Sequence, residues 1–342
     1  MTEHQGALMA PYLGVFPRID SPLTFAGGGA VVLGRATLGK DAWLDAHSVI
    51  RADGHDVHIG DDFHLGEHAT VHIAHDVYPT HIGHGVSAGR GAVIHACTVG
   101  DGCVFEGGAV ILDGSIIGPG AVISAGSVVF PRSELEGGWL YSGSPAKPVA
   151  RLTAPELEAM HMAVRRDRAK APRKSGHATT LDCFVAPSAY VSGDIRVGEG
   201  VGIWYGCTLD AAGHVIHIGD GTNIQDNSSI LCENSDVVIA ADVTIGHNVT
   251  LVDCRIETGS LVGIGSHIAA GTLVESDVLV AAGTRTLPGQ RLTGGQVWAG
   301  NPARPLGPMD ARKRAMLAGT LPTYRAYAAE FRKTVHMPIE QS

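Results

Sequence analysis

The sequence has few aromatic residues, no long hydrophobic run and fewer basic than acidic residues, 25 Lys and Arg against 34 Asp and Glu. Phe, Trp and Tyr make up only 5% of the 342 residues, whereas glycine occurs 46 times. So few large side chains cannot fill the wide core of a globular domain, which favours a solenoid built of thin stacked layers. A chain of this length is expected to contain about two domains.

The same absences exclude several kinds of partner. A net charge of -9 and an isoelectric point near 6.0 argue against nucleic acid and against an anionic membrane surface as the main partner. No stretch is long enough to span a bilayer, and the N-terminal sequence MTEHQGALMAPYLGVFPRID lacks the basic and apolar regions of a signal peptide. We expect a soluble, cytoplasmic protein.

The cysteines lack the CxxC spacing of many metal and redox sites. Most of them occupy repeat positions where a small apolar side chain would serve, so we expect reduced thiols in the core rather than ligands or disulfides. The six are Cys97, Cys103, Cys183, Cys207, Cys232 and Cys254.

An apolar residue recurs at every sixth position in both halves of the chain. A period of six sustained this long fits neither a single helix nor a flat sheet. Each hexad predicts one short strand and a turn, and three hexads close a triangular coil of about 18 residues. The longest runs are Val99 to Val129 in the first half, and Val185 to Leu209 and Ile256 to Val280 in the second.

The two halves also align with each other. HIGDDFHLGEHATVHI from His58 matches HIGDGTNIQDNSSILC from His217, and each repeat run ends in a similar phrase, GSPAKPV at Gly143 and GNPARPL at Gly300. The fold is therefore expected twice, as an all-β solenoid of two tandem β-helices.

Helical patterns follow each repeat run. They extend from Pro155 to Lys170, from Met309 to Leu317 and from Thr323 to Lys333. We predict two domains, residues 1–170 and 171–342, each a β-helix with a C-terminal helix, and a polar linker from Ala169 to Thr180.

Seven short motifs stand out within the repeats. They are IRAD at Ile50, HIAHDVYPTHIG at His72, VIHACTVGDGC at Val93 and GWLYSGSPAK at Gly138 in the first half, and IWYGCTL at Ile203, NIQD at Asn223 and TIGHNVTL at Thr244 in the second. Together they resemble the gamma-class carbonic anhydrases and their relatives among the left-handed β-helix hexapeptide-repeat proteins. The left-handed winding is implied by this resemblance and not by the periodicity.

The resemblance implies a metal site shared between domains. In that family three prisms associate side by side, and each metal, usually zinc, takes two histidines from one prism and the third from a neighbour. The matching positions are His72, Arg90 and His95 in the first domain, and Leu231, His247 and Val252 in the second. Neither domain alone has histidine at all three positions, so His72, His95 and His247 would form one hybrid site for Zn²⁺, with Fe²⁺ or Co²⁺ as alternatives.

The repeat register places His72 and His95 in one column. Each follows the apolar residue of its hexad, and their separation of 23 residues equals one coil plus a five-residue insertion. They should stack on adjacent coils, roughly 4.8 Å apart, where one ion can bind both. His247 occupies a different position in its hexad and lies on another face, so it can only complete a site on a neighbouring prism.

The opposite faces have lost the matching residues. In the first domain Arg90 replaces the donor histidine, and the carboxylates of Glu67 and Glu106 can neutralise it. In the second domain Leu231 and Val252 replace the paired histidines, so that column cannot hold zinc.

The resemblance assigns supporting roles to four further residues. Gln225 would orient the water on the metal, Arg51 and Asp226 would support the site, and Tyr141 would line the pocket. A contact that ties prisms together is an equally good interpretation of Arg51 with Asp53, as is core packing for Tyr141.

Other histidines crowd the segment around His72 but fall in different registers. We interpret them as solvated or turn residues, with His75 and His81 as the best candidates for contact with the ligands. They are His58, His64, His68, His75, His81 and His84.

A zinc ion with three histidines and an open fourth position lowers the pKa of bound water toward about 7. The resemblance therefore implies a metal-dependent lyase or hydrolase that hydrates carbon dioxide or a related small molecule, in a homo-oligomer with first-domain to second-domain contacts. Other functions stay open: a retooled metalloenzyme acting on a larger carbonyl or imine metabolite, a metal-free acyltransferase of the same solenoid class, and a non-catalytic assembly module.

Overall fold

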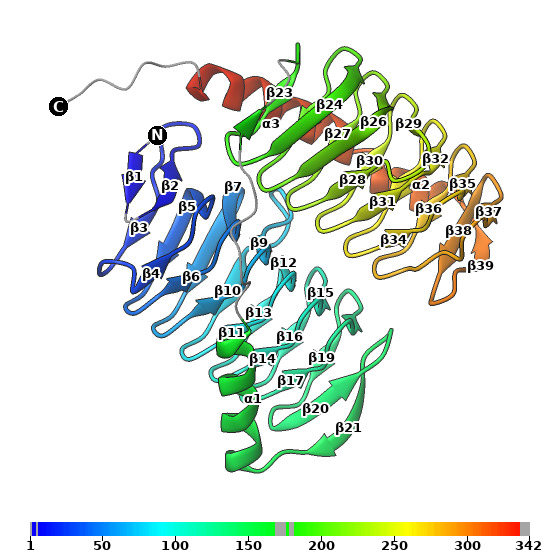
Figure 1. Cartoon of the computed structure of the whole chain (residues 1–342). Coiled ribbons are helices and arrows are strands. Elements are labelled where there is room, and N and C mark those ends of the chain that lie inside the picture. Colours follow the sequence, from blue (N-terminus) through cyan, green and yellow to red (C-terminus); the bar gives the residue numbers. More distant parts are fainter. Residues whose placement is uncertain (1, 5, 168–175, 178–180, 336–342) are drawn as a thin grey trace. The chain divides into compact units, whose positions relative to one another are not determined.

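Short parallel strands stack into three-faced coils in each half of the chain (Figure 1). The computed structural model describes residues 2–4, 6–167, 176–177 and 181–335, in two units, Met1–Arg173 and Lys174–Ser342. The predicted fold class, two tandem left-handed parallel β-helices each followed by helix, is confirmed. The predicted linker, Ala169 to Thr180, lies outside the described residues apart from Gly176–His177.

Two faces of the first unit form one continuous sheet, because β7 turns the corner between them. The first face holds β9, β12, β15 and β18, and the second face holds β10, β13, β16 and β19. The strands of this sheet are β1 (Thr2–His4), β2 (Ala7–Ala10), β3 (Arg18–Ile19), β5 (Val31–Leu38), β7 (Val49–Ile59), β9 (Thr70–His72), β10 (Thr80–Ile82), β12 (Val93–His95), β13 (Thr98–Val99), β15 (Val110–Ile111), β16 (Ile116–Ile117), β18 (Val128–Val129) and β19 (Glu134–Leu135).

The third face of the first unit is a separate sheet that ends in an antiparallel hairpin. Its strands are β4 (Phe25–Ala26), β6 (Trp43–Leu44), β8 (His64–Leu65), β11 (Ser87–Ala88), β14 (Val104–Phe105), β17 (Val122–Ile123), β20 (Trp139–Ser142) and β21 (Lys147–Arg151).

The second unit repeats this arrangement. The sheet of its first and second faces contains β22 (Gly176–His177), β24 (Tyr190–Val197), β26 (Thr208–Ile218), β28 (Ser229–Leu231), β29 (Val237–Ile239), β31 (Thr250–Val252), β32 (Arg255–Ile256), β34 (His267–Ile268), β35 (Leu273–Val274) and β37 (Arg291–Leu292). Its third face contains β23 (Phe184–Val185), β25 (Gly202–Ile203), β27 (Asn223–Ile224), β30 (Thr244–Ile245), β33 (Leu261–Val262), β36 (Leu279–Val280), β38 (Gln296–Ala299) and β39 (Arg304–Pro308).

The period of six arises from the corners of the coil. The apolar residue of each hexad points inward, so that Ile50, Val71 and Ile94 lie in register and are fully buried. The turn after each strand takes a residue with a left-handed backbone, such as His68 with φ 53° or Asn248 with φ 55°. Polar side chains that tolerate this conformation therefore collect at the corners, and His68 is a turn histidine as expected.

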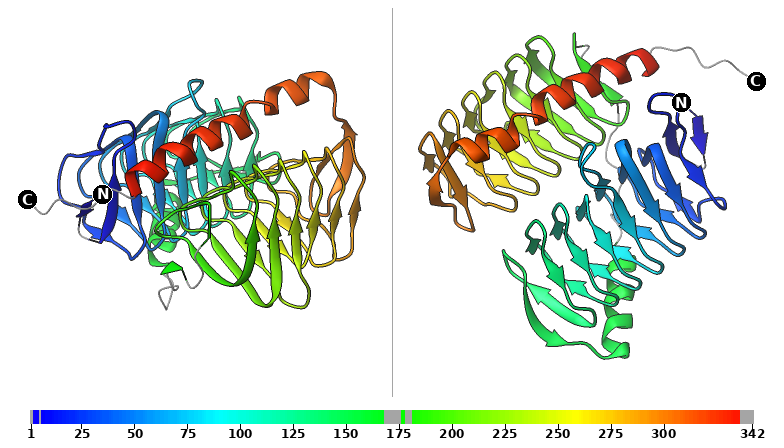
Figure 2. Two further views of the ribbon diagram at one scale, coloured as in Figure 1. Left: turned by 90° about the horizontal axis from the view of Figure 1, so that it is seen from above. Right: turned by 180° about the vertical axis from the view of Figure 1, so that it is seen from behind.

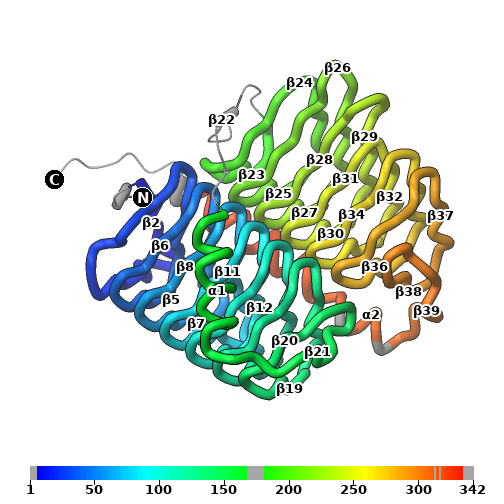
Figure 3. The backbone as a smooth tube through the Cα atoms, turned by 60° about the horizontal axis from the view of Figure 1, so that its bottom comes forward, coloured from blue at the N-terminus to red at the C-terminus, as the bar shows by residue number. Residues whose placement is uncertain are grey.

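The helices cover the third faces (Figures 2 and 3). Helix α1 (Ala154–Arg166) starts at a capping box formed by Thr153 and Glu156 and packs Val164 against Val104 and Val122. Helices α2 (Ala311–Leu317) and α3 (Thr320–Val335) follow the second unit, and aromatic residues of α3 pack on Trp204. All three predicted helices are present, although α1 ends at Arg166. None of the helices in the described part of the chain combines the length and the apolar character needed to span a bilayer.

All six cysteines are free and buried, which confirms the interpretation as core thiols. Burial raises the pKa of the Cys97 and Cys254 thiols, and it raises the pKa of Cys103 to about 12.

Because the thiolate is the reactive form of cysteine, we expect Ellman's reagent at pH 8 to label Cys97, Cys103 and Cys254 only after denaturation. The burial of these thiols would be contradicted if the folded protein were labelled rapidly and if Cys97→Ser, Cys103→Ser or Cys254→Ser abolished that labelling.

Candidate metal centre

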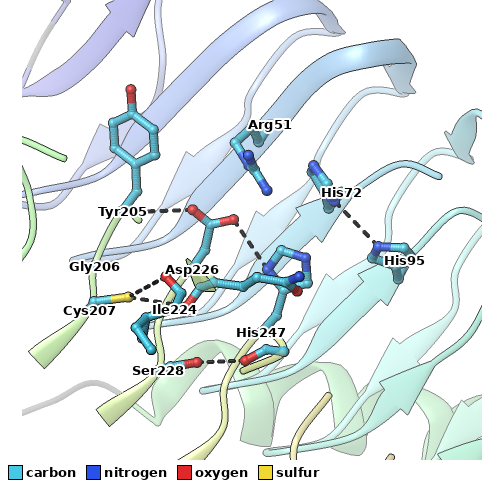
Figure 4. A network of polar contacts seen from close by, with 12 residues as sticks. Arg51, His72, His95, Tyr205, Gly206, Cys207, Ile224, Asp226, Ser228 and His247 are labelled. Carbon is cyan, nitrogen blue, oxygen red and sulfur yellow. Dashed lines mark hydrogen bonds and ion pairs between the residues drawn. The ribbon is translucent and has the colours of Figure 1, made fainter. Parts of the chain in front are cut away.

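His72 and His95 lie side by side on the first face of the first unit. Strands β9 and β12 pair in parallel with His72 directly opposite His95, which confirms the register expected from the sequence. The ring centroids are 5.3 Å apart, and His72 Nδ1 lies 3.3 Å from His95 Nε2 (Figure 4). One nitrogen of each ring therefore faces the other ring.

A carboxylate contacts the far nitrogen of each ring. His72 Nε2 is 3.1 Å from Asp53 Oδ1, and His95 Nδ1 is 2.7 Å from Asp113 Oδ1. A carboxylate can only accept, so these contacts assign the ring protons to the far nitrogens and the lone pairs to the facing ones. Two lone pairs cannot hydrogen-bond to each other, and a cation between them satisfies both.

The separation of the facing nitrogens fits a tetrahedral metal. With Zn–N bonds of about 2.0–2.1 Å, two ligands at the tetrahedral angle lie about 3.3–3.4 Å apart. The observed 3.3 Å between His72 Nδ1 and His95 Nε2 agrees with this separation. Imidazole nitrogens also suit Fe²⁺ and Co²⁺, so the donor set fits a metal of this class without selecting one.

Arg51 acts on this pair through Asp53. Arg51 Nη1 donates to Asp53 Oδ2 at 2.7 Å, and both side chains are buried. The second oxygen of the same carboxylate contacts His72. Arg51 is thus a positioning residue in the first unit, and the sequence interpretation missed both the contact of Asp53 with His72 and the role of Asp113.

The second unit presents a third histidine held by aspartate. His247 follows β30 and stacks one coil beyond Asp226, which follows β27. His247 Nδ1 is 3.1 Å from Asp226 Oδ2, and Asp226 Oδ1 accepts a hydrogen bond of 3.1 Å from the backbone N–H of Tyr205 (Figure 4). The Nδ1 proton therefore faces Asp226, and Nε2 is the nitrogen that can bind a metal.

A tyrosine contacts that nitrogen. The hydroxyl of Tyr324, in α3, lies 3.3 Å from His247 Nε2 and can donate a hydrogen bond to it. A metal bound at Nε2 has to displace this hydroxyl. Tyr324 was not identified from the sequence, because it belongs to a helix that lies 77 residues further along the chain.

Gln225 is oriented by a chain of side-chain amides. Its Nε2 donates to Asn223 Oδ1 at 3.2 Å, and Asn223 Nδ2 donates to Thr244 Oγ1 at 3.1 Å. These contacts leave Gln225 Oε1 as the acceptor of the amide. Asn223 is therefore a positioning residue for Gln225.

Tyr141 does not join either group of residues. It lies on β20 in register with the inward residue Ile123, belongs to the apolar core of the first unit, and donates from its hydroxyl to the backbone oxygen of Glu136 at 2.9 Å. Core packing accounts for this position, and pocket lining stays a prediction.

The other positions that the resemblance matches to ligands carry side chains with different contacts, and the expected pairing of Arg90 holds for one of its two carboxylates. Arg90 forms an ion pair with Glu67, whereas Glu106 accepts instead from the backbone N–H of Ala125. Leu231 lies in register with Val252 in the β28–β31 pair, and neither offers a ligand atom.

The histidines expected near the ligands lie elsewhere. His81 is exposed on the second face beside His58, which agrees with its interpretation as a solvated residue and places it away from the ligand column. His75 lies in the loop after β9 beside Asp76, at 3.3 Å.

Comparison with known proteins points to one group of relatives. No family model matches the chain. Gamma carbonic anhydrase 1, mitochondrial, of Arabidopsis thaliana is 37% identical over 167 residues, which cover 46% of this chain and 61% of the relative. Protein YrdA of Escherichia coli is 37% identical over 155 residues, which cover 44% of this chain and 84% of the relative. The chain spans 47% to 63% of the length of the three Arabidopsis relatives that it matches.

A solved structure resembles nearly the whole chain. A candidate acetyltransferase of Desulfovibrio desulfuricans superposes with a TM-score of 0.56 at 14% identity, covering 95% of this chain and 82% of that one. At this identity the likeness concerns the fold alone.

We expect Asp113→Asn to weaken metal binding by about tenfold or more, because it removes the carboxylate that fixes the tautomer of His95. Zinc affinity would be measured by competition with a chelating dye. Asp236→Asn is the matched control, since it removes a carboxylate 3.8 Å from His214 in the second unit. Equal affinities of the Asp113 variant and wild type would show that this contact does not position a ligand.

Tyr324→Phe should instead strengthen metal binding, by about fivefold. The variant removes a hydrogen bond, worth about 1 kcal/mol, that competes with the metal for His247 Nε2. The same dye competition measures the effect, with Tyr327→Phe in the same helix as control. A weaker affinity of Tyr324→Phe would mean that the hydroxyl helps to hold the site.

Proposed function

Because this chain belongs to the gamma carbonic anhydrase-like family of left-handed β-helix hexapeptide-repeat proteins, as a tandem duplication, we propose that it is a metal-dependent lyase or hydrolase of carbonic anhydrase type. Its substrate is carbon dioxide or a small molecule hydrated or hydrolysed by the same chemistry. The metal is Zn²⁺, with Fe²⁺ or Co²⁺ as alternatives. Its ligands are His72 and His95 of a first domain, residues 1–170, and His247 of a second domain, residues 171–342.

The observation that carries this proposal is the repeated pairing of histidine with aspartate. Each candidate ligand has a carboxylate on one ring nitrogen, from Asp53, Asp113 or Asp226. This arrangement raises the basicity of the other nitrogen and fixes the ring, as in many metal sites. Exposed histidines such as His75 and His214 also contact aspartates, but the pairs of His72 with Asp53 and of His247 with Asp226 are buried.

The losses on the opposite faces support a site between unlike domains. The first unit keeps the paired histidines but has Arg90 at the donor position, and the second unit keeps the donor but has Leu231 and Val252 in the column. Three histidines therefore require one domain of each kind. This proposal includes a homo-oligomer with first-domain to second-domain contacts, no nucleic-acid or membrane partner, and a cytoplasmic location.

The residues around the ligands have distinct roles. A zinc ion with three histidine ligands lowers the pKa of a bound water to about 7 and supplies a nucleophile at neutral pH. Gln225, whose amide is oriented by Asn223, would offer its Oε1 as a hydrogen-bond acceptor to a water at the site. Arg51, through Asp53, holds the ring of His72, and Asp226 holds the ring of His247.

Metal analysis tests the hybrid site. After dialysis in metal-free buffer without chelator, the wild-type chain should retain stoichiometric metal by mass spectrometry. His95→Ala and His247→Ala should each lose it while remaining folded, since two histidines alone bind weakly. The matched control is His217→Ala, a histidine of the second face of the second unit. Retention of metal by His247→Ala, or a metal-free wild type after reconstitution, would refute the hybrid site.

Carbon dioxide hydration in a stopped-flow assay then decides the substrate. Activity that disappears in both ligand variants supports carbonic anhydrase chemistry. A metal-loaded but inactive wild type would favour a larger carbonyl or imine substrate, whereas a metal-free protein would favour an acyltransferase or an assembly module.

A further inference from the structure

A second stacked pair of histidines lies on another face of the first unit. His58 of β7 and His81 of β10 are direct partners in a parallel strand pair on the second face. Their ring centroids are 5.2 Å apart and their planes are inclined by 44°. The corresponding values for His72 and His95 are 5.3 Å and 51°. Two pairs on different faces thus share nearly the same ring spacing and inclination.

The surroundings of this second pair are open. Both side chains are exposed, and in the described part of the chain no hydrogen bond or ion pair engages the ring nitrogens of His58 or His81. The rings lie over a shallow groove that Thr37, Gly60 and Gly83 also line. A ligand can therefore approach both rings from solvent.

The surroundings of His81 favour the neutral form of its ring. Partial shielding of its ring from water lowers the pKa of His81, and the neighbouring His58 and His55 lower it further, while Asp56 raises it. The neutral imidazole is the form that binds metals. His55 is not a ligand in this conformation, because its Nδ1 accepts from the backbone N–H of Asp56 at 2.8 Å.

We propose that His58 and His81 form a second, solvent-facing site for a borderline divalent transition metal, with water completing the coordination. Two imidazoles on adjacent strands suit Cu²⁺, Ni²⁺ and Zn²⁺, and Cu²⁺ should bind most tightly. Mg²⁺ and Ca²⁺, which require oxygen ligands, should not bind. This site uses none of the ligands of the candidate metal centre and does not depend on the proposed function.

The second unit supplies a natural control for this geometry. His217 occupies the position that matches His58, but its partner across the β26–β29 pair is Val238. A single histidine at this position lacks the second ligand. His217→Ala should therefore leave metal binding unchanged, whereas Val238→His should create a second copy of the site.

Cu²⁺ and Ni²⁺ titrations of the full chain, loaded beforehand with Zn²⁺ at its tightest site, test the proposal. We expect one further equivalent in wild type, an affinity at least about tenfold weaker in His58→Ala and in His81→Ala, and no change in His217→Ala. Val238→His should bind about one equivalent more than wild type. Circular dichroism checks that every variant is folded.

Three results would overturn the site. The first is unchanged Cu²⁺ and Ni²⁺ binding in both His58→Ala and His81→Ala, and the second is a loss of affinity in His217→Ala equal to the loss in these variants. The third is a wild-type Cu²⁺ affinity no higher than that of His81→Ala, which keeps only one histidine of the pair. The His247→Ala variant separates the two proposals. It should lose the metal of the hybrid site and still bind Cu²⁺ at His58 and His81.

Discussion

Parallel in-register stacking of the coils is the constraint on which every site in this protein depends. Each residue lies beside its counterpart one coil away. Val71 therefore pairs with Ile94 on the inside of the prism, and His72 pairs with His95 on the outside. The supporting carboxylates of Asp53 and Asp113 reach the two rings from the coils before and after, at positions offset from the ligand register. A shift of the strand register by one residue would point these side chains in other directions and separate the two histidines from each other and from their carboxylates.

The period of six made the fold and the ligand column predictable. It fixes which residues point inward, and a separation of 23 residues then places His95 on His72. The same separation relates His58 and His81, which are also paired. The register places His81 on the second face, which separates it from the ligand column although it is close to His72 in the sequence.

Other parts of the site could not be derived from the repeat. The register puts Leu112, and not Asp113, beneath His95, so the carboxylate reaches its partner from the next position along the chain. Tyr324 comes from helix α3, and the packing of a helix across a β-helix leaves no trace in the period of the strands. The hydrogen-bond chain from Thr244 through Asn223 to Gln225 depends on side-chain conformations, which the repeat pattern does not specify.

In the proposed association the replacements also select the partner. A guanidinium aimed at two histidines and a metal would be repelled, so Arg90 disfavours first domains meeting first domains across this face. Glu67 compensates its charge within the unit, which avoids the cost of burying an unpaired cation. Leu231 and Val252 remove any competing ligands from the second domain. Complementary losses after duplication would thus convert a symmetric contact into one that accepts only unlike domains.

The two histidine pairs show what ring geometry alone does not provide. Their spacing and inclination are nearly equal, yet only His72 and His95 have carboxylates that assign the proton to the far nitrogen and hold the ring in place. His58 and His81 must select a tautomer and give up side-chain freedom when a metal binds, which costs affinity. Preorganisation by aspartate, more than the number of histidines, therefore distinguishes the two sites. The pair of His72 and His95 is suited to hold a metal during catalysis, whereas the pair of His58 and His81 is suited to exchange its metal with the solvent.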